Sequence, residues 1–234
     1  MGVLAAQVAE REEMLARLRR SLQAGNALPP FVAVPTPPEP PAPDRQQMLH
    51  EFETQLNILQ GRAVRTPRAK LTGCIDGLLR ERGVHTLLAW DAAQLPAAQL
   101  LQDLQAREYE IVAAQVPQAE PARAQHLQTL ATAAAGITGV DGVIAQVGGL
   151  VLCGGPGRPR HASLLAPLHI ALFTPAQLWP TLAAWLAAQS SAALFADSSS
   201  VTVIAGPSRT SDIERVLTLG VHGPKELIAV CIED

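Results

Sequence analysis

The side chains best suited to bind an anion lie in a segment that reads GPSRTSD, from Gly206 to Asp212. The segment follows the strand-like run VTVIA, and we expect it to open a helix over 209–219. The N-terminus of a helix presents unpaired N–H groups and a partial positive charge. Arg209 adds a guanidinium that can hold a carboxylate or phosphate through two hydrogen bonds. The sequence therefore predicts an anion-binding loop at this point of the chain.

The same segment has a simpler interpretation as a helix start. Ser208 or Thr210 can accept a hydrogen bond from the first turn, as capping residues do. Arg209 can then pair with Asp212 or Glu214 on the following turn. The sequence leaves both interpretations open.

A second loop, from Cys153 to Arg160, reads CGGPGRPR. Its three glycines allow a backbone to approach a ligand closely, and Arg158 and Arg160 add positive charge. The spacing matches neither a Walker loop nor the GxGxxG fingerprint of dinucleotide-binding proteins. We therefore favour a glycine-rich hairpin turn over a phosphate site.

Two histidines could act as a base on a hydroxyl group, because imidazole titrates near neutral pH. His169 opens a predicted strand, where a buried, hydrogen-bonded ring is the alternative. His222 lies in the tight turn GVHGP. A helix of ten residues spans about 15 Å, so a helix over 209–219 would place His222 at the opposite edge from Arg209 unless that helix is shorter or tilted. Neither histidine has the spacing of a metal ligand.

Composition excludes several classes of protein. Hydrophobic residues make up 48% of the 234 residues and charged residues 17%, unlike a disordered chain. A net charge of −3 with 3% aromatic residues argues against a nucleic-acid-binding protein. The three cysteines, Cys74, Cys153 and Cys231, are too far apart for a disulfide framework or an iron–sulfur motif. With no signal-like segment and no apolar run of about 20 residues, we expect a cytoplasmic protein without a membrane span.

Three regions follow one another along the chain. Region 1–28 contains an amphipathic helix over 2–23, and 29–43 holds eight prolines in fifteen positions. Such a composition is typical of an extended connector, with an SH3-type ligand as the alternative. We expect the main domain to cover 44–234.

The main domain alternates between predicted strands and helices, beginning with a helix capped by Asp44 and closed by Gly61. Strands are expected at 63–65, 85–90, 110–116, 149–153, 169–173, 201–205 and 227–232. Helices are expected at 67–82, 96–107, 121–135, 175–189 and 209–219. This alternation predicts an α/β fold with a mostly parallel sheet flanked by helices. Ligands of such sheets bind beyond the carboxyl ends of the strands.

The C-terminal half also resembles a known family. Residues 206–227 read GPSRTSDIERVLTLGVHGPKEL, similar to the signature GPSRTADIE…LVLGVHGP of the LUD-domain family, lactate-utilization protein C group. Residues 142–152 (GVIAQVGGLVL) resemble the AIAETGTLVL segment of that family. Residues 160–173 (RHASLLAPLHIALF) resemble its RLASLLPPVHIAVV segment.

The resemblance implies a fold like that of the ribose-5-phosphate isomerase and CoA-transferase group. It also implies a role in the oxidation of L-lactate to pyruvate, together with partner subunits that carry the iron–sulfur clusters. Arg209 or Arg160 would hold the lactate carboxylate, and His169 or His222 would take the hydroxyl proton. The motif positions carried over as substrate-binding are Arg160, Ser163, Gly206, Ser208, Arg209, Thr210, Asp212, Glu214 and Gly223.

The chain departs from the family pattern at Gln146, where relatives have glutamate. A glutamate could serve as a base or an acyl acceptor, whereas glutamine can do neither. Two other functions stay open. The helix-capped anion loop suggests a free-standing α/β enzyme or binding protein for a phosphorylated or CoA-linked small molecule, and Gln146 with the N-terminal helix suggests a non-catalytic scaffold subunit. The sequence leaves a homo-oligomer open as well.

Overall fold

The structure is a computed structural model of the chain, and it describes residues 2–23, 43–113, 116–189, 198–211, 217–220 and 222–233. The chain divides into two units, Met1–Pro40 and Pro41–Asp234, each described by itself. In the first unit, the N-terminal helix is α1 (Gly2–Gln23). Apart from Pro43, the expected connector lies outside the described residues.

The second unit is built on a six-stranded sheet in which all neighbouring strands run parallel. The strand order is β1 (Arg62–Pro67), β12 (Glu226–Glu233), β7 (Leu168–Phe173), β4 (Ala135–Thr138), β2 (Thr86–Ala89) and β3 (Glu110–Val112). Every residue of β7 is buried, as expected for a parallel strand covered on both faces. The predicted α/β fold with a mostly parallel sheet is confirmed.

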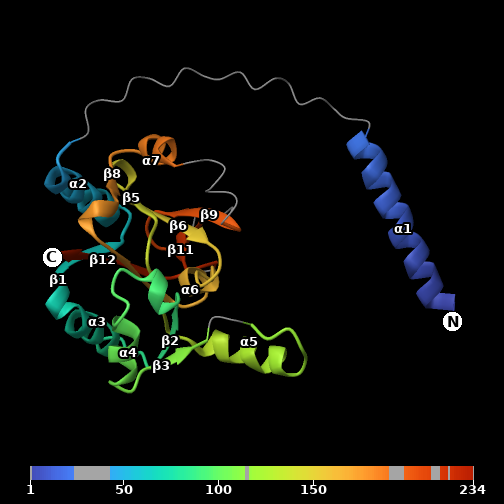
Figure 1. The fold of residues 1–234 in the computed structure, drawn as a ribbon, viewed down its shortest axis with the longest axis horizontal. Helices are drawn as coiled ribbons and strands as arrows, with labels where there is room; N and C mark the ends of the chain where they lie inside the picture. The colour runs from blue at the N-terminus through green and yellow to red at the C-terminus, as the bar shows by residue number, and fades with distance from the viewer. Residues whose placement is uncertain are drawn as a thin grey trace. The chain divides into compact units, whose positions relative to one another are not determined.

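Helices cover both faces of this sheet (Figure 1). The α-helices are α2 (Arg45–Ile58), α3 (Leu71–Arg80), α4 (Leu100–Gln105), α5 (Ala122–Thr132), α6 (His161–Leu164) and α7 (Leu182–Ala188). Short 3-10 turns are η1 (Arg68–Lys70), η2 (Ala92–Gln94), η3 (Ala145–Val147) and η4 (Pro175–Gln177). Helix α2 begins as predicted, because the Asp44 carboxylate accepts a hydrogen bond of 2.8 Å from the Gln47 N–H.

A second, smaller sheet packs with α2 and α7 on the face opposite α3 and α4 (Figure 1). Its order is β8 (Leu178–Trp179), β5 (Gly142–Ile144), β6 (Gly149–Gly154) and β9 (Ser200–Ile204). The strands predicted at 149–153 and 201–205 therefore form, but as an antiparallel pair outside the main sheet. Strands β4, β5 and β8 were not predicted. Each has two to four residues, and the helix predicted at 121–135 ended on the first residue of β4.

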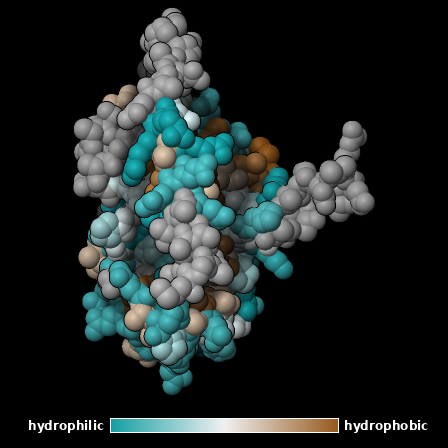
Figure 2. Space-filling view, turned by 90° about the vertical axis from the view of Figure 1, so that its right-hand side faces the viewer, coloured by the Kyte–Doolittle hydropathy of each residue, from teal (hydrophilic) through white to brown (hydrophobic). Residues whose placement is uncertain are grey.

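The face of the molecule in Figure 2 is mixed rather than uniformly polar. On the face in Figure 2, hydrophobic residues are exposed in small patches between hydrophilic ones. Val201 and Val203 of β9 are among the exposed apolar side chains, at 36% and 42%. Both lie on the last strand of the smaller sheet.

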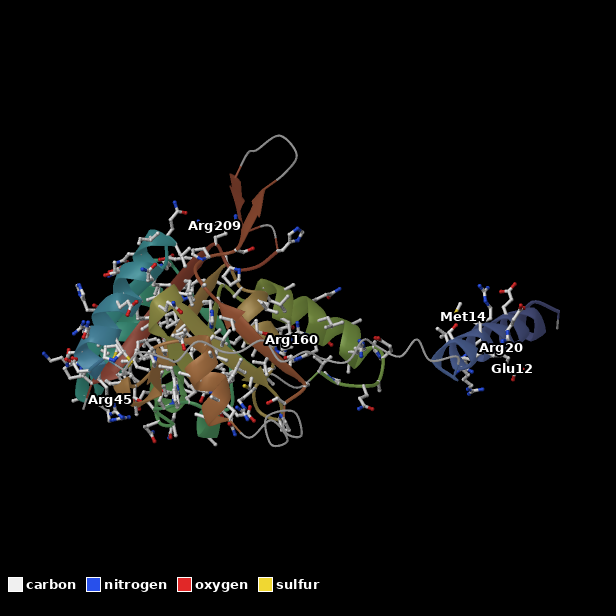
Figure 3. All side chains as sticks on the ribbon, turned by 90° about the horizontal axis from the view of Figure 1, so that it is seen from above. Glu12, Met14, Arg20, Arg45, Arg160 and Arg209 are labelled. Atoms are coloured by element: carbon white, nitrogen blue, oxygen red, sulfur yellow. The ribbon has the colours of Figure 1, made fainter. Side chains whose placement is uncertain are left out.

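The helix predicted over 209–219 is wrong. Arg209–Ser211 forms β10 and Leu217–Leu219 forms β11, and the two strands pair antiparallel. This hairpin stands off the body of the domain, with Arg209 at its foot (Figure 3). Gly206 and Gly220 have φ angles of +83° and +75°, which bend the chain at both ends of the hairpin.

The helix predicted at 175–189 is only partly correct. Pro180 cannot donate the backbone hydrogen bond that a helix interior requires. The segment instead contains η4, β8 and the shorter helix α7, which starts after its N-cap Thr181. The helix predicted at 96–107 is likewise reduced to α4.

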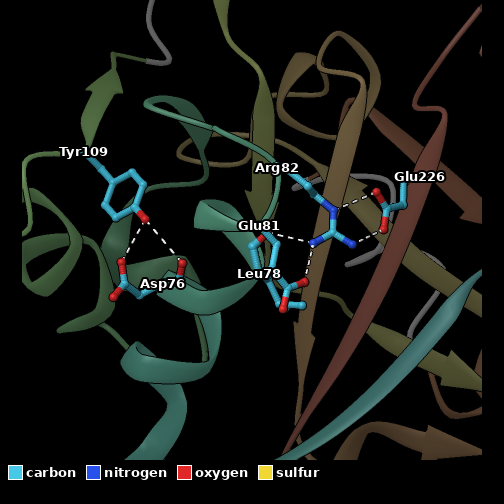
Figure 4. A network of polar contacts seen from close by, with 6 residues as sticks. All are labelled: Asp76, Leu78, Glu81, Arg82, Tyr109 and Glu226. Carbon is cyan, nitrogen blue, oxygen red and sulfur yellow. Dashed lines mark hydrogen bonds and ion pairs between the residues drawn. The ribbon is translucent and has the colours of Figure 1, made fainter.

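Two polar networks hold the C-terminal end of α3 and the turn after it against the rest of the domain (Figure 4). The buried Asp76 carboxylate accepts hydrogen bonds from Tyr109, Arg80 and Arg107. Burial raises the pKa of Asp76, but these hydrogen bonds outweigh burial and hold it below its usual value. Arg82 pairs with Glu226 at the start of β12.

The contact between β4 and α6 gives a direct test of the packing. A Cβ at Gly136 would lie 1.7 Å from the Ala162 carbonyl oxygen, and backbone cannot move aside cheaply. We expect Gly136→Ala to lower the free energy of unfolding by about 3 kcal/mol or more. Urea unfolding measures this loss.

Gly73 of α3 supplies the matched control. It is exposed, and a Cβ there meets nothing within 4 Å. Gly73→Ala should raise stability by about 0.5–1 kcal/mol, because alanine has the higher helix propensity. Equal changes in the free energy of unfolding for Gly136→Ala and Gly73→Ala would contradict the packing of α6 on β4.

Candidate functional site

A cavity of about 280 Å³ opens beside the smaller sheet. Its walls come from β9, α6, the loop before β10, the loop after β11, and the first residues of β7 and β12. The lining residues are Ser163, Leu164, His169, Thr202, Val203, Ile204, Ala205, Gly206, Ser208, His222, Gly223, Pro224 and Leu227. The site therefore combines two histidines and three hydroxyl side chains with apolar walls.

The hairpin brings the two halves of the GPSRT…GVHGP motif to one place. The Ser208 N–H donates to the Pro224 carbonyl at 2.9 Å, and the Gly220 N–H donates to the Ser208 carbonyl at 2.9 Å. Gly206 packs against α2, where a Cβ would lie 2.7 Å from the Leu59 carbonyl oxygen. The expectation that His222 lies at the opposite edge from this loop is wrong. The two antiparallel strands of the hairpin lead the chain back to where it started, so Ser208 and His222 line the same cavity, whereas a helix would have separated them.

Where the cavity meets the main sheet, it lies at the amino ends of β7 and β12. His169 and Leu227 are paired neighbours, each the second residue of its strand. The general rule for α/β sheets places ligands at the carboxyl ends. This cavity lies at the opposite ends of β7 and β12, where the smaller sheet and the hairpin build its wall.

His169 lies completely buried at this wall. Its Nε2 and the Thr138 Oγ1 are 2.9 Å apart, and its Nδ1 has no hydrogen-bond partner among the described residues. Burial lowers the pKa of His169 to about 4. The ring is therefore neutral near pH 7 and is a weak base.

The remaining polar groups differ in exposure. Ser163 is buried, and its hydroxyl donates to the Arg160 carbonyl at 3.0 Å. Ser208 and Gly223 are half-buried, whereas His222 is exposed. His222 is therefore the lining histidine that bulk water reaches.

Neither predicted arginine lines the cavity. The Arg209 guanidinium donates to the Leu59 carbonyl at the end of α2. Arg160 is exposed, and Figure 3 shows it well apart from Arg209. The side chain of Thr210, and Asp212 and Glu214 altogether, lie outside the described residues. The structure thus brings together Ser163, His169, Gly206, Ser208, His222 and Gly223.

The loop from Cys153 to Arg160 is the hairpin turn that we favoured. Gly155 and Arg158 form an antiparallel bridge, and Gly157 has a φ angle of +72°. The Arg158 guanidinium pairs with Asp141 at 2.7 Å. Its charge is therefore already matched within the fold.

Sequence reasoning missed Thr138 and most of the apolar wall. Thr138 ends the short strand AGIT, and nothing in that pattern indicates a partner for a histidine 31 residues later. Thr202–Ala205 were identified as a strand, but their place beside the cavity depends on the pairing of β9 with β6. Only tertiary structure supplies these neighbours.

The cysteines do not fit a metal cluster on this chain. They lie on three different elements: Cys74 on α3, Cys153 on β6 and Cys231 on β12. Burial raises the pKa of Cys153 to about 11 and of Cys231 to about 12, so both are neutral thiols near pH 7. Across the described ranges, no three His, Cys, Asp or Glu side chains gather as metal ligands would.

The described helices were also compared with the length and hydropathy that a bilayer requires. None of them is both long and apolar enough to cross a membrane.

The buried imidazole makes a prediction about pH. The pKa of His169 is about 4 in the folded chain and about 6.5 in the unfolded chain. Below pH 6.5 the unfolded state therefore binds a proton that the folded state excludes, so stability falls as the pH drops towards 4. We expect a loss of about 3 kcal/mol, complete near pH 4, that His169→Gln removes.

Urea unfolding of both proteins between pH 4 and 7.5 measures the difference. Asp76 and Glu226, whose pKa values are lowered, affect both proteins equally. Parallel loss of stability in the two proteins would rule out a buried neutral His169.

Comparison with known proteins places the chain in a family. Lactate utilization protein C of Macrococcus caseolyticus is 27% identical over 81% of this chain and 80% of its own length. The protein of the same name from Halalkalibacterium halodurans is 27% identical over 95% of this chain and 94% of its own. The crystal structure of a DUF162 family protein from Deinococcus radiodurans shares the fold, with a TM-score of 0.61, 21% identity, and coverage of 82% of this chain and 99% of that one. The profile of the LUD domain matches residues 49–232, and the chain belongs to the LUD domain family.

Proposed function

We propose that this chain is a component of an L-lactate utilization system and that it binds L-lactate in the cavity beside β9. The name of the relatives from Macrococcus caseolyticus and Halalkalibacterium halodurans supports the system. The observation that carries the proposal is that six motif residues, distant in sequence, surround one small space. Two of them are the histidines expected to handle a hydroxyl group.

The cavity suits a short hydroxy acid. Leu164, Ile204 and Leu227 offer an apolar surface to the methyl group. Ser208 offers a hydroxyl donor to the carboxylate. None of the described lining residues is acidic, so no like charge opposes an anionic ligand.

Oxidation of L-lactate to pyruvate removes two electrons and two protons. We assign the hydroxyl proton to His222, because its imidazole is exposed at the cavity and can pass a proton on to water. His169 is a weak base with a pKa of about 4 and contributes by hydrogen bonding. The C2 hydrogen would leave with its bonding electron pair to a two-electron acceptor on the partner subunits, whose iron–sulfur clusters would carry the electrons on, since the three cysteines of this chain lie on separate elements.

The structure bears on the features that motivated the two alternatives. A phosphorylated or CoA-linked ligand was suggested by a helix N-terminus at Arg209, and that segment is strand β10. A scaffold role was suggested by Gln146 and by the N-terminal helix. That helix forms as α1, whereas Gln146 is exposed on η3 and does not line the cavity. Glutamine in place of glutamate at position 146 therefore does not change the residues that line the cavity.

A substitution that fills the cavity tests whether lactate binds there. The backbone hydrogen bonds of Ser208 do not involve its side chain, so Ser208→Phe can occupy the space while the hairpin stays closed. We expect it to weaken L-lactate binding at least about tenfold, or ~1.4 kcal/mol, by titration calorimetry.

Two variants outside the cavity serve as controls. Gln146→Glu and Arg209→Ala should keep L-lactate affinity within about twofold, because neither side chain lines the cavity. Loss of binding in Arg209→Ala with normal binding in Ser208→Phe would move the site to the foot of the hairpin and overturn the assignment.

Isolation of the tagged chain from lactate-grown source cells tests the partner subunits. We expect iron–sulfur polypeptides to co-purify, and the eluate to reduce a dye when L-lactate is added. Ser208→Phe should retain the partners but lose the dye reduction. Recovery of the chain alone, without lactate-dependent activity, would contradict the proposed complex.

A further inference from the structure

Two buried side chains behind the cavity form an isolated hydrogen-bonded pair. Thr138 on β4 and His169 on β7 are both 0% exposed, and His169 lines the cavity whereas Thr138 does not. The Thr138 Oγ1 and the His169 Nε2 are 2.9 Å apart. Among the described residues, Thr138 Oγ1 has no other hydrogen-bond partner and His169 Nδ1 has none.

The proton in this pair can lie in two places. If the His169 Nε2–H donates to Thr138, the threonine O–H is left without an acceptor behind the cavity wall. If the Thr138 O–H donates to Nε2, the ring carries its own hydrogen on Nδ1. An unpaired buried donor costs about 1–3 kcal/mol. The second arrangement avoids this cost at Thr138 and leaves the unpaired donor on the buried Nδ1 of His169, the member of the pair that lines the cavity, so an acceptor must come from a molecule that enters the cavity and displaces the packing over Nδ1.

We propose that Thr138 donates to His169 Nε2 and fixes the Nδ1–H form of the ring, so that His169 presents an N–H donor to the C2 oxygen of a 2-hydroxy or 2-oxo acid. The ligand class rests on the proposed function, whereas the position of the proton does not. Thr138 is thus a positioning residue, which acts on the ligand only through His169.

This arrangement separates the roles of the two histidines. Nδ1 already carries a hydrogen, so His169 cannot accept the hydroxyl proton there, and its low pKa keeps the ring uncharged. The Nδ1–H group can donate a hydrogen bond to the hydroxyl oxygen of lactate or to the carbonyl oxygen of pyruvate, because both oxygens are on C2 and both can accept. The carbonyl oxygen is an acceptor only, so the hydrogen bond persists after oxidation.

The position of the proton is measurable by NMR on the full chain with 15N-labelled histidine. Long-range 1H–15N correlation at pH 7 distinguishes the two neutral forms and the imidazolium. His169→Gln assigns the signal by its absence among the six histidines. We expect a protonated Nδ1 and an unprotonated Nε2 in the native chain and in Thr138→Ser, and a shift towards Nε2–H in Thr138→Val. A native Nε2–H form or an imidazolium would overturn the proposal, whether or not Thr138→Val folds.

Added ligands then test the recognition step. L-lactate and pyruvate should both shift the His169 Hδ1 resonance, whereas propionate, which lacks the C2 oxygen, should not. Thr138→Val should weaken pyruvate binding about threefold to tenfold and leave propionate binding unchanged. Nδ1–H without any response to L-lactate or pyruvate would refute the ligand class alone. An Nε2–H ring together with normal lactate binding would refute the role of Thr138 alone.

Discussion

Two backbone hydrogen bonds hold the foot of the β10–β11 hairpin closed, and the candidate site depends on them. They join Ser208 to Pro224 and Gly220 to Ser208, which places the loop before the hairpin against the loop after it. Neither bond involves a side chain, so the closure depends on backbone conformation. Gly206 and Gly220 permit that conformation because their φ angles are positive. A helix in the same segment would separate the two loops and leave no cavity.

The closed loops take their position from α2 and the main sheet. Phe52 of α2 packs edge-to-face on Phe173 of β7, with ring centroids 5.5 Å apart, which sets α2 on the same face of the sheet as His169. The end of α2 then contacts Gly206, and its Leu59 carbonyl accepts from Arg209. On the same face, α6 packs onto β4 at Gly136 and carries Ser163 to the cavity. Apolar packing of α2 and α6 on the main sheet therefore sets the positions of the polar residues in the site.

The sequence was most informative where a pattern is long. The apolar runs of β7 and β12 predicted buried parallel strands, and Asp44 predicted the start of α2. Glycine, proline and serine in GPSRT and GVHGP identified the segments that line the cavity. The residues of the site could thus be named, but their arrangement could not.

Two kinds of information were beyond the sequence pattern. The segment 209–219 contains polar residues that suit a helix start or a turn, and its strand conformation depends on pairing between Arg209 and Leu219. Thr138 is recognisable as functional only when β4 and β7 lie side by side. Arg209 carries the charge that an anion site needs, yet it faces the end of α2. All three features depend on contacts between residues that are far apart in the sequence.

Binding of L-lactate in the cavity beside β9, with an oxygen on His169, can be observed in a crystal structure of the full chain grown in saturating L-lactate. We expect lactate density between Ser208 and His169, with the C2 oxygen within hydrogen-bond distance of Nδ1. Lactate bound at the carboxyl ends of the parallel strands, or an empty cavity at saturation, would contradict it.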